Sequence, residues 1–245
     1  MLVTRKPEGP RLGVVSLDAI GYRNTIDLPD PFNAPPPPPD EPTGFFMHPA
    51  FWPVPTAFAI APGTGGSVLL EGRPDAIEAI ADAVDRLAPH CDLIVGNCGY
   101  MYYARSAVRT ETPTLLSALQ LLPYALQSTT RPVGILTFNK AFTKTMLSDH
   151  PDRSRLRIVG VSALPNWSAL NHRDWLVKIP RVNMDEFRRE LIEVCLRERQ
   201  GRAFMDIGSI VLECTAMPQF RADIVAALRL PTWDIAAVAR SLLGA

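Results

Sequence analysis

The sequence predicts an α/β fold made of two pseudo-symmetric halves with parallel sheets. Short apolar runs, typical of buried strands, alternate with stretches whose apolar residues recur at helical spacing. The order of these segments repeats once along the chain, and each copy carries one cysteine directly after a core strand. Strands that alternate with helices indicate parallel sheets, so we expect two flavodoxin-like halves with an active site in the cleft between them.

The predicted strands are apolar runs rich in valine and isoleucine, at residues 11–17, 91–98, 132–138 and 208–212. Helices are predicted from amphipathic spacing at residues 75–87, 114–127, 183–200 and 235–243. The stretch 28–62 is rich in proline and includes five consecutive prolines at 35–39, which excludes helix there. We interpret this stretch as a surface loop or, alternatively, as a semi-rigid flap over a site.

Three segments of the first half recur in the same order in the second half. Gly13–Asp18 matches Gly134–Asn139 in residue type, and Leu93–Met101 matches Ser209–Met217 with Ile, Val, Cys and Met identical. The third match is a Pro-Thr pair, found at 113–114 and again at 231–232. The repeat predicts a first half of residues 1–115 plus 231–245, which carries Cys98. The second half then comprises residues 116–230 and carries Cys214.

Composition narrows the expected partners. The 245 residues are enough to bury a substantial core, and the 25 basic and 25 acidic side chains balance. Zero net charge gives no reason to expect nucleic acid or an anionic membrane, so the expected partner is a small-molecule substrate. The N-terminal residues lack the apolar stretch of a signal peptide, and no run is apolar enough to span a membrane. We expect a cytoplasmic protein, and leave open whether it is a homo-oligomer.

The four cysteines are too few for a disulfide scaffold and lack zinc-ligand spacing, so we expect no metal and no cofactor. Cys98 and Cys214 follow core strands, where ligands bind in parallel sheets and where helix N-termini lower the pKa of a thiol. Two thiols on opposite sides of a cleft suit the removal of a proton from one face of a carbon and its return to the other. Cys91 and Cys195 are expected to be inert core residues.

Two motifs around these cysteines resemble a known family. The segment 213–218, Glu-Cys-Thr-Ala-Met-Pro, resembles the ECTNMP signature at the second cysteine of the aspartate/glutamate/hydantoin racemase superfamily. Asn97-Cys98-Gly99 resembles the first-cysteine turn of that family, and Asp18 resembles the acidic residue after its first strand. The resemblance covers most of the chain. It implies a two-domain α/β enzyme that uses no pyridoxal phosphate and has two cysteines as opposed base and acid.

One position departs from the family pattern. Family members commonly have Asn where this chain has Ala216, and that Asn often helps to hold a substrate carboxylate. Three tyrosines, Tyr100, Tyr102 and Tyr103, follow Cys98 closely. These differences favour a flatter or bulkier substrate than a plain amino acid.

Besides the two thiols, seven residues near the expected strand ends are predicted to bind substrate. Hydroxyl groups are candidates for cradling a carboxylate or carbonyl, the Asp and Asn side chains for orienting a thiol or the substrate, and backbone N–H groups for binding an anion. Asp18 and Asn139 have the alternative of capping the following helix. The seven are Ser16, Asp18, Asn97, Gly99, Thr137, Asn139 and Thr215.

The predicted function is cofactor-independent racemisation or epimerisation by two-thiol proton transfer. The proton would leave a carbon next to a carbonyl of an amino acid or of a cyclic derivative such as a hydantoin. One alternative keeps the scaffold for cis–trans isomerisation, decarboxylation or ring opening with a single nucleophilic cysteine. A second alternative is a non-catalytic small-molecule binding protein, against which the matched pair of thiols argues.

Overall fold

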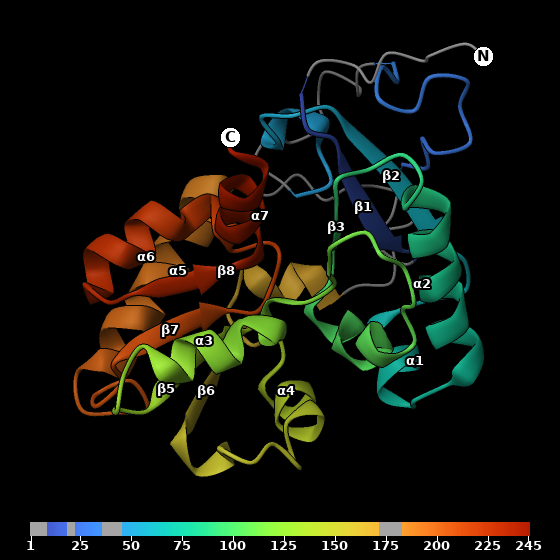
Figure 1. Cartoon of the computed structure of the whole chain (residues 1–245). Helices are drawn as coiled ribbons and strands as arrows, with labels where there is room; N and C mark the ends of the chain where they lie inside the picture. The colour runs from blue at the N-terminus through green and yellow to red at the C-terminus, as the bar shows by residue number, and fades with distance from the viewer. Residues whose placement is uncertain (1–8, 19–22, 36–45, 172–182) are drawn as a thin grey trace.

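The computed structural model describes residues 9–18, 23–35, 46–171 and 183–245, and Figure 1 shows two α/β halves side by side. Each half contains a four-stranded sheet in which every pair of neighbouring strands is parallel. The first sheet consists of β1 (Leu12–Leu17), β2 (Thr56–Ala61), β3 (Leu93–Gly96) and β4 (Thr114–Leu115). The second consists of β5 (Val133–Thr137), β6 (Leu156–Gly160), β7 (Ser209–Leu212) and β8 (Thr232–Asp234). The predicted fold class is confirmed.

The two sheets have the same topology and register. Their strand orders are β2-β1-β3-β4 and β6-β5-β7-β8, so each strand of the first half has a counterpart four strands later. Leu12 of β1 pairs with Leu93 of β3, and the counterparts Val133 and Ser209 pair in the same way. These are the pairings that the sequence repeat implies, so the repeat is confirmed at the level of single residues.

Helices connect the strands as in other parallel sheets. They are α1 (Gly66–Leu70), α2 (Pro74–Leu87), α3 (Leu122–Gln127), α4 (Lys140–Met146), α5 (Met184–Arg199), α6 (Arg221–Leu228) and α7 (Ile235–Leu243). The helix α2 begins with Pro74 in its first turn and buries one face, which includes Ile80, Val84 and Leu87. The Asn183 side chain caps α5 by accepting hydrogen bonds from two backbone N–H groups.

Within the described residues, six 3-10 helices complete the connections. They are η2 (Pro49–Phe51), η3 (Gly99–Ser106), η4 (Ala118–Leu121), η5 (Arg153–Arg155), η6 (Trp167–Asn171) and η8 (Pro218–Phe220). Two of them, η3 and η8, lie at or near the turns that carry Cys98 and Cys214. No helix in the described ranges is both long enough and apolar enough to cross a membrane.

Two sequence expectations about these elements are wrong. The stretch 28–62 contains β2 as well as loop, and β2 occupies the edge of the first sheet next to β1. The proposed flap falls partly on residues 36–45, which lie outside the described residues. The predicted helix at 114–127 begins instead with β4, because the Ser117 side chain caps η4 together with Gln120 and so starts the helical turn later.

The expected boundary at 230/231 also needs correction at β8. Thr232–Asp234 pairs with β7 and therefore belongs to the second sheet, not to the first half. The following helix, α7, does return to the first half, because its buried residues Ile235, Ala236 and Ala239 join the core that surrounds β1 to β3. The same core includes Val133 of β5, so the hydrophobic core is continuous between the halves.

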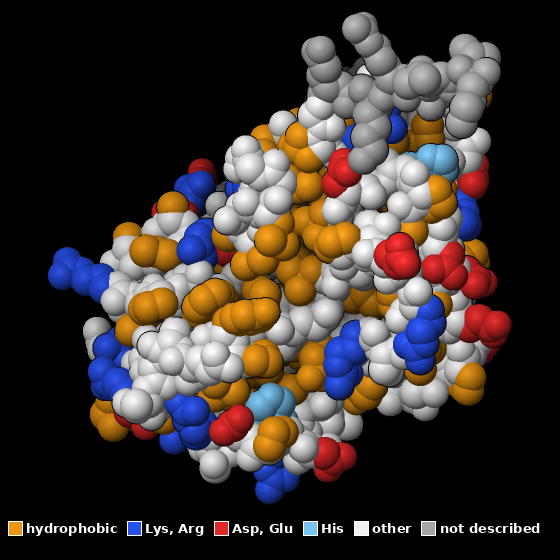
Figure 2. Space-filling model, viewed as in Figure 1, with side chains coloured by type: hydrophobic (Ala, Val, Ile, Leu, Met, Phe, Trp, Pro, Cys, Tyr) orange, Lys and Arg blue, Asp and Glu red, His pale blue; other side chains and the backbone are white. Residues whose placement is uncertain are grey.

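Apolar side chains are also exposed on one face of the molecule. Figure 2 shows them gathered across the middle of this face, over α3 and β8, with most charged side chains nearer the periphery. Tyr124 of α3 is 61% exposed and stacks on Trp233 of β8 with ring centroids 6.5 Å apart. The homo-oligomer stays an open expectation.

Candidate active site

The predicted site residues lie at the carboxyl ends of the four central strands. Those of β1 and β3 come from the first half, and those of β5 and β7 from the second half. In Figure 1 the arrows of β7 and β8 point toward the first half, so the ends of the second sheet face the other half. This convergence brings Cys98 and Cys214, which are far apart in the sequence, to one site between the halves.

In the first half, the Asn97 side chain connects the end of β3 to the end of β1 through hydrogen bonds. Its side-chain oxygen accepts a hydrogen bond from the Leu17 backbone N–H at 3.0 Å, and its side-chain nitrogen donates to Ser16 Oγ at 2.7 Å. Cys98 then occupies the N-cap position of η3, and the backbone N–H of Tyr100 donates toward its sulfur. Ser16 and Asn97 are both buried, so they support the cysteine turn from the protein interior.

The second half repeats this arrangement with different chemistry. Thr137 stands at the position of Ser16, and Glu213 at the position of Asn97. The Thr137 hydroxyl donates to Glu213 Oε2 at 2.6 Å and lies 2.7 Å from the Thr143 hydroxyl of α4. The backbone N–H of Ala216 donates toward the Cys214 sulfur, as that of Tyr100 does toward Cys98.

Three contacts join the two halves around the cysteine turns, and the first two of them link one turn directly to the other. The Thr215 hydroxyl donates a hydrogen bond to the backbone carbonyl of Asn97. The Glu213 carboxyl group lies against Gly99, where an added Cβ atom would be only 1.7 Å from Oε1. The Tyr100 ring lies edge-to-face on Phe142 of α4, with ring centroids 5.6 Å apart. The site is therefore assembled from both halves.

Burial dominates the electrostatics of the site. It raises the pKa of Glu213 to about 7, against the hydrogen bond from Thr137 and the nearby Phe138 backbone N–H. Burial and then the charge of Glu213 raise the pKa of Cys98 to about 12. The pKa of Cys214 is raised by burial, by Glu213 and by Cys98. The pKa of Tyr100 is raised by burial and by all three of these groups.

The comparisons with known proteins can be set beside this geometry. No family model matches the chain. Dimethylsulfoniopropionate lyases 6 and 3 of Emiliania huxleyi (strain CCMP1516) are each 27% identical over 164 residues, which is 61% of this chain and 41% of each lyase. Lyase 7 of the same organism is 25% identical over 97% of this chain and 67% of its own length. The chain thus spans about two fifths of the first two relatives.

Solved structures match nearly the whole chain. Arylmalonate decarboxylase superimposes with a TM-score of 0.55 at 15% identity, covering 96% of this chain and 92% of the other. Picrophilus torridus aspartate racemase has a TM-score of 0.51 at 16% identity, covering 96% and 95%. Allantoin racemase from Pseudomonas fluorescens has a TM-score of 0.51 at 13% identity, covering 96% and 89%. The chain therefore shares its overall fold with these decarboxylase and racemase structures.

In this fold, the predicted residues divide into those that face the cysteine turns and those that hold loops. Asp18 accepts a hydrogen bond from the Gly63 backbone N–H at 2.9 Å, which fastens the loop after β2. The Asn139 side chain caps α4 by accepting from the backbone N–H groups of Ala141 and Phe142, which is the alternative weighed for it. A direct role of either side chain in binding substrate stays a prediction.

The expectation that both cysteine thiols have a lowered pKa is wrong for this structure. Each sulfur receives one backbone N–H, but Cys98 precedes a 3-10 helix and not an α-helix, and Cys214 lies three residues before Met217, the N-cap of the three-residue η8. Removal from water and the neighbouring Glu213 outweigh that single hydrogen bond. Formation of a thiolate therefore depends on what else binds in the site and on the charge of Glu213.

Glu213 is the residue that the sequence reasoning missed. In the sequence it is part of the cysteine motif, and a glutamate at the end of an apolar strand is an unusual residue to bury. That position was the available signal. Its neighbourhood in the folded chain, between Gly99 and Thr137, depends on contacts across the halves that no local pattern encodes.

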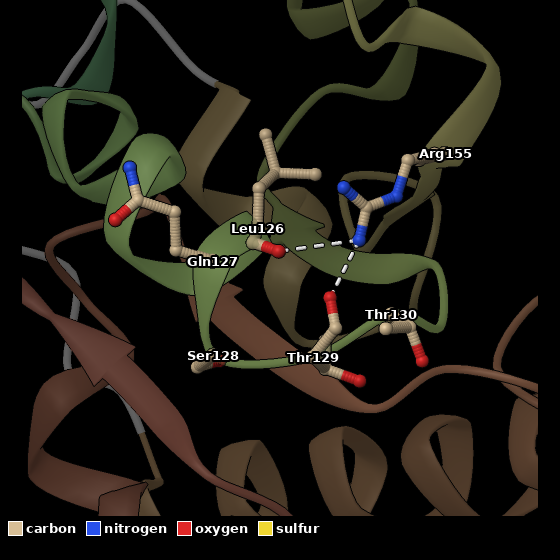
Figure 3. A pocket seen from close by; sticks show the side chains of 6 residues that line it. All are labelled: Leu126, Gln127, Ser128, Thr129, Thr130 and Arg155. Atoms are coloured by element: carbon tan, nitrogen blue, oxygen red, sulfur yellow. Dashed lines mark hydrogen bonds between the residues drawn. The ribbon is translucent and has the colours of Figure 1, made fainter.

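The remaining cysteines and the surface hollows lie apart from this site. Cys195 is buried in the core of the second half, and Cys91 lies beside Gly13 at the start of β1. A hollow at residues 126–130 and Arg155 lies at the opposite edge of the second sheet, before β5 and β6 begin (Figure 3). There the Arg155 guanidinium is already bound to the backbone carbonyls of Leu126 and Thr129. Among the residues with described placement, no cluster of three His, Cys, Asp or Glu could hold a metal ion.

Proposed function

We propose that this protein is an enzyme that moves a proton at a carbon next to a carboxylate or carbonyl group, with Cys98 and Cys214 as the acid/base pair. The observation that carries the proposal is the meeting of two equivalent cysteine turns at one site, one from each half. A thiolate on one side takes the proton from carbon, and the bonding electrons enter an enolate. The thiol on the other side returns a proton to the opposite face, which inverts the carbon.

Racemisation or epimerisation without pyridoxal phosphate is the outcome that this pair serves best. The fold shared with aspartate racemase and allantoin racemase supports it, and an amino acid or a cyclic amino-acid derivative is the proposed substrate. A general base contributes about 10²- to 10⁴-fold to the rate, so the enolate also needs preorganised donors. Backbone N–H groups in the two cysteine turns are candidates for this.

Deuterium exchange tests the proposal directly. Purified protein is incubated in D₂O with single enantiomers of aspartate, glutamate and 5-substituted hydantoins, and exchange at the α-carbon and loss of optical rotation are followed. We expect exchange with at least one of these compounds, and at least about 10²-fold slower racemisation in both Cys98→Ser and Cys214→Ser. Cys195→Ser is the matched control and should retain the activity. Near-normal turnover in one of the two site variants would contradict the two-thiol mechanism.

A lyase reaction is the second candidate, favoured by the 25% identity with dimethylsulfoniopropionate lyase 7 over 97% of this chain. Elimination begins with the same step, removal of a proton next to a carboxylate. The electrons then expel dimethyl sulfide from the adjacent carbon and leave acrylate, so only one base is essential. Release of dimethyl sulfide from dimethylsulfoniopropionate, lost in one cysteine variant and kept in the other, would favour this candidate over racemisation.

A further inference from the structure

Two buried polar atoms at the site have no hydrogen bond in the described structure. They are the Tyr100 hydroxyl oxygen and Glu213 Oε1. Removing such groups from water without a compensating hydrogen bond is unfavourable, so two of them at one place indicate a missing partner. Both belong to the cysteine turns and interact electrostatically with each other and with Cys98 and Cys214.

The carboxyl group of Glu213 is held in a fixed position. Oε2 accepts the 2.6 Å hydrogen bond from Thr137, whose hydroxyl also contacts Thr143. Oε1 lies against Gly99, where the missing side chain provides the space that the oxygen occupies. The free oxygen therefore cannot turn away to find water without breaking the bond to Thr137.

The Tyr100 ring is held from both halves as well. It lies edge-to-face on Phe142 of α4 and against Gly66 of α1, where an added Cβ would be 2.9 Å from the ring. Its hydroxyl lies near the Asn139 backbone N–H without forming a hydrogen bond of ordinary geometry. The O–H group is consequently fixed in place and available to donate.

The equivalent position in the first half shows that the fold does not need a carboxyl group here. Asn97 occupies it, and both polar atoms of its side chain are bonded within the half, to Leu17 and Ser16. Glu213 makes the counterpart bond to Thr137 with one oxygen, whereas its second oxygen, Oε1, has no hydrogen bond of ordinary geometry, although the Phe138 backbone N–H lies near the carboxyl group. The extra oxygen thus serves something other than strand connection.

We propose that Tyr100 and the protonated carboxyl group of Glu213 are the two O–H donors that hold a carboxylate or carbonyl oxygen of the substrate. This inference rests on the proposed function and assigns its oxyanion-binding residues. As the proton leaves carbon, negative charge grows on that oxygen, and hydrogen bonds to it strengthen in the transition state. Because the donors are already fixed and desolvated, little reorganisation accompanies the reaction.

The protonation states of the groups around Glu213 agree with its role as a hydrogen-bond donor. The titratable groups that face Glu213 are Cys98 and Tyr100 from the first half and Cys214 from its own strand end, while β5 contributes the neutral Thr137. All three titratable neighbours are neutral at neutral pH, since their pKa values are raised. With its own pKa at about 7, Glu213 is neutral below that pH, and a bound carboxylate favours its protonated form further.

A pair of alkylating reagents tests the proposal without knowledge of the substrate. Iodoacetate and iodoacetamide both react with a thiolate, forming a carbon–sulfur bond and releasing iodide, but only iodoacetate carries a carboxylate. The rates of both reagents at Cys98 and Cys214 are measured by peptide mass spectrometry, and their ratio is normalised to the ratio for glutathione. Because both rates are proportional to the fraction of thiolate, this fraction cancels in the ratio. We expect this ratio to fall about tenfold or more between pH 6 and pH 8, as Glu213 ionises and repels iodoacetate.

Three variants sharpen the test. Glu213→Gln cannot ionise, so its ratio should not change with pH. Tyr100→Phe should lower the ratio at pH 6 severalfold and keep the fall with pH. Glu190→Gln is the matched control, because Glu190 is a buried carboxyl group of α5 that is bonded to Asn166 and not to either cysteine turn in the described structure, and its ratio should match the wild type.

A wild-type ratio that stays constant with pH, or a Glu213→Gln ratio that still falls, overturns the proposal. If Glu213→Gln fails to fold, the wild-type pH dependence and Tyr100→Phe decide the question. The outcome is independent of the deuterium-exchange test, because alkylation needs no turnover. A protein that shows no deuterium exchange but has a pH-dependent alkylation ratio would overturn the proposed function alone. A protein that shows exchange but has a constant ratio would overturn the donor assignment alone.

Discussion

Glu213 links the chemistry of single residues to the stability of the protein. Burial raises its pKa from the ordinary value of 4.5 to about 7. Between these two pH values the folded protein binds more protons at this group than the unfolded chain does. The contribution of Glu213 to stability is therefore fully present below pH 4.5 and is lost as the pH rises through 7.

Replacement of Glu213 by Gln should remove this pH dependence. Relative to wild type, the free energy of unfolding of Glu213→Gln should rise by roughly 2–3 kcal/mol between pH 5 and pH 8, because only the wild type must ionise a buried group. Urea unfolding at the two pH values measures it. Glu190→Gln, which removes another buried carboxyl group, serves as the control, and an equal change in both variants would count against the raised pKa of Glu213.

For single residues, the sequence predicted where the site residues lie better than it predicted their pKa values. The repeat identified Cys98 and Cys214 and paired Ser16 with Thr137, because residues directly after core strands have a fixed place in parallel sheets. The direction of the thiol pKa shifts could not be predicted. It depends on how much water each sulfur loses and on Glu213, both of which follow from packing between the halves.

Among the elements, η3 determines how closely the first cysteine turn approaches the second half. It begins at Gly99, whose missing side chain makes room for Glu213 Oε1. Any larger residue at this position must displace either η3 or the Glu213 side chain. The hydrogen bond between Glu213 and Thr137 would then be strained or broken.

Gly99→Ala should accordingly destabilise the protein and open the site. We expect a loss of about 1–3 kcal/mol in the free energy of unfolding, typical of overpacking, together with faster alkylation of Cys98 as η3 moves outward. Ser106→Ala, at the exposed end of the same element, is the control and should change neither quantity by much. Unchanged stability in Gly99→Ala would mean that the two turns are not in close contact.

The strands that the sequence missed are defined by pairing with distant strands. β2 follows a run of prolines, so the sequence predicts a loop there, although β1 pairs with β2 along its whole length. β4 and β8 contain only two and three residues, too few to show a periodicity. The predicted helix at 114–127 starts only at Ala118 for a local reason, since Ser117 forms a capping box in the middle of an apolar run.

The molecule as a whole has two sheets but a shared core. Val133, Ile135 and Leu156 of the second sheet are buried in the same cluster as the strands of the first half. The last helix, α7, follows β8 of the second sheet and packs into that cluster too. The two halves therefore depend on each other for burial of their apolar side chains.

Unfolding should consequently be a single cooperative transition. Urea titrations followed by far-ultraviolet and near-ultraviolet circular dichroism should coincide. Residues 116–230 alone should remain unfolded, because this fragment lacks β8 and exposes Val133 and Ile135. Two separate transitions, or a folded fragment, would instead show that the halves are independent domains.

The pseudo-symmetry of the halves is broken where Asn97 in the first half has Glu213 as its counterpart in the second, and for a racemase thermodynamics limits the effect of such a difference. Mirror-image substrates have equal free energy, so the Haldane relation requires kcat/KM to be the same in both directions. Different residues on the two sides of the substrate can therefore make kcat and KM differ between the two enantiomers only by the same factor. An enzyme of this design would bind one enantiomer more tightly and convert it proportionately more slowly. Initial rates measured from each pure enantiomer would then saturate at different concentrations but share one slope at low concentration.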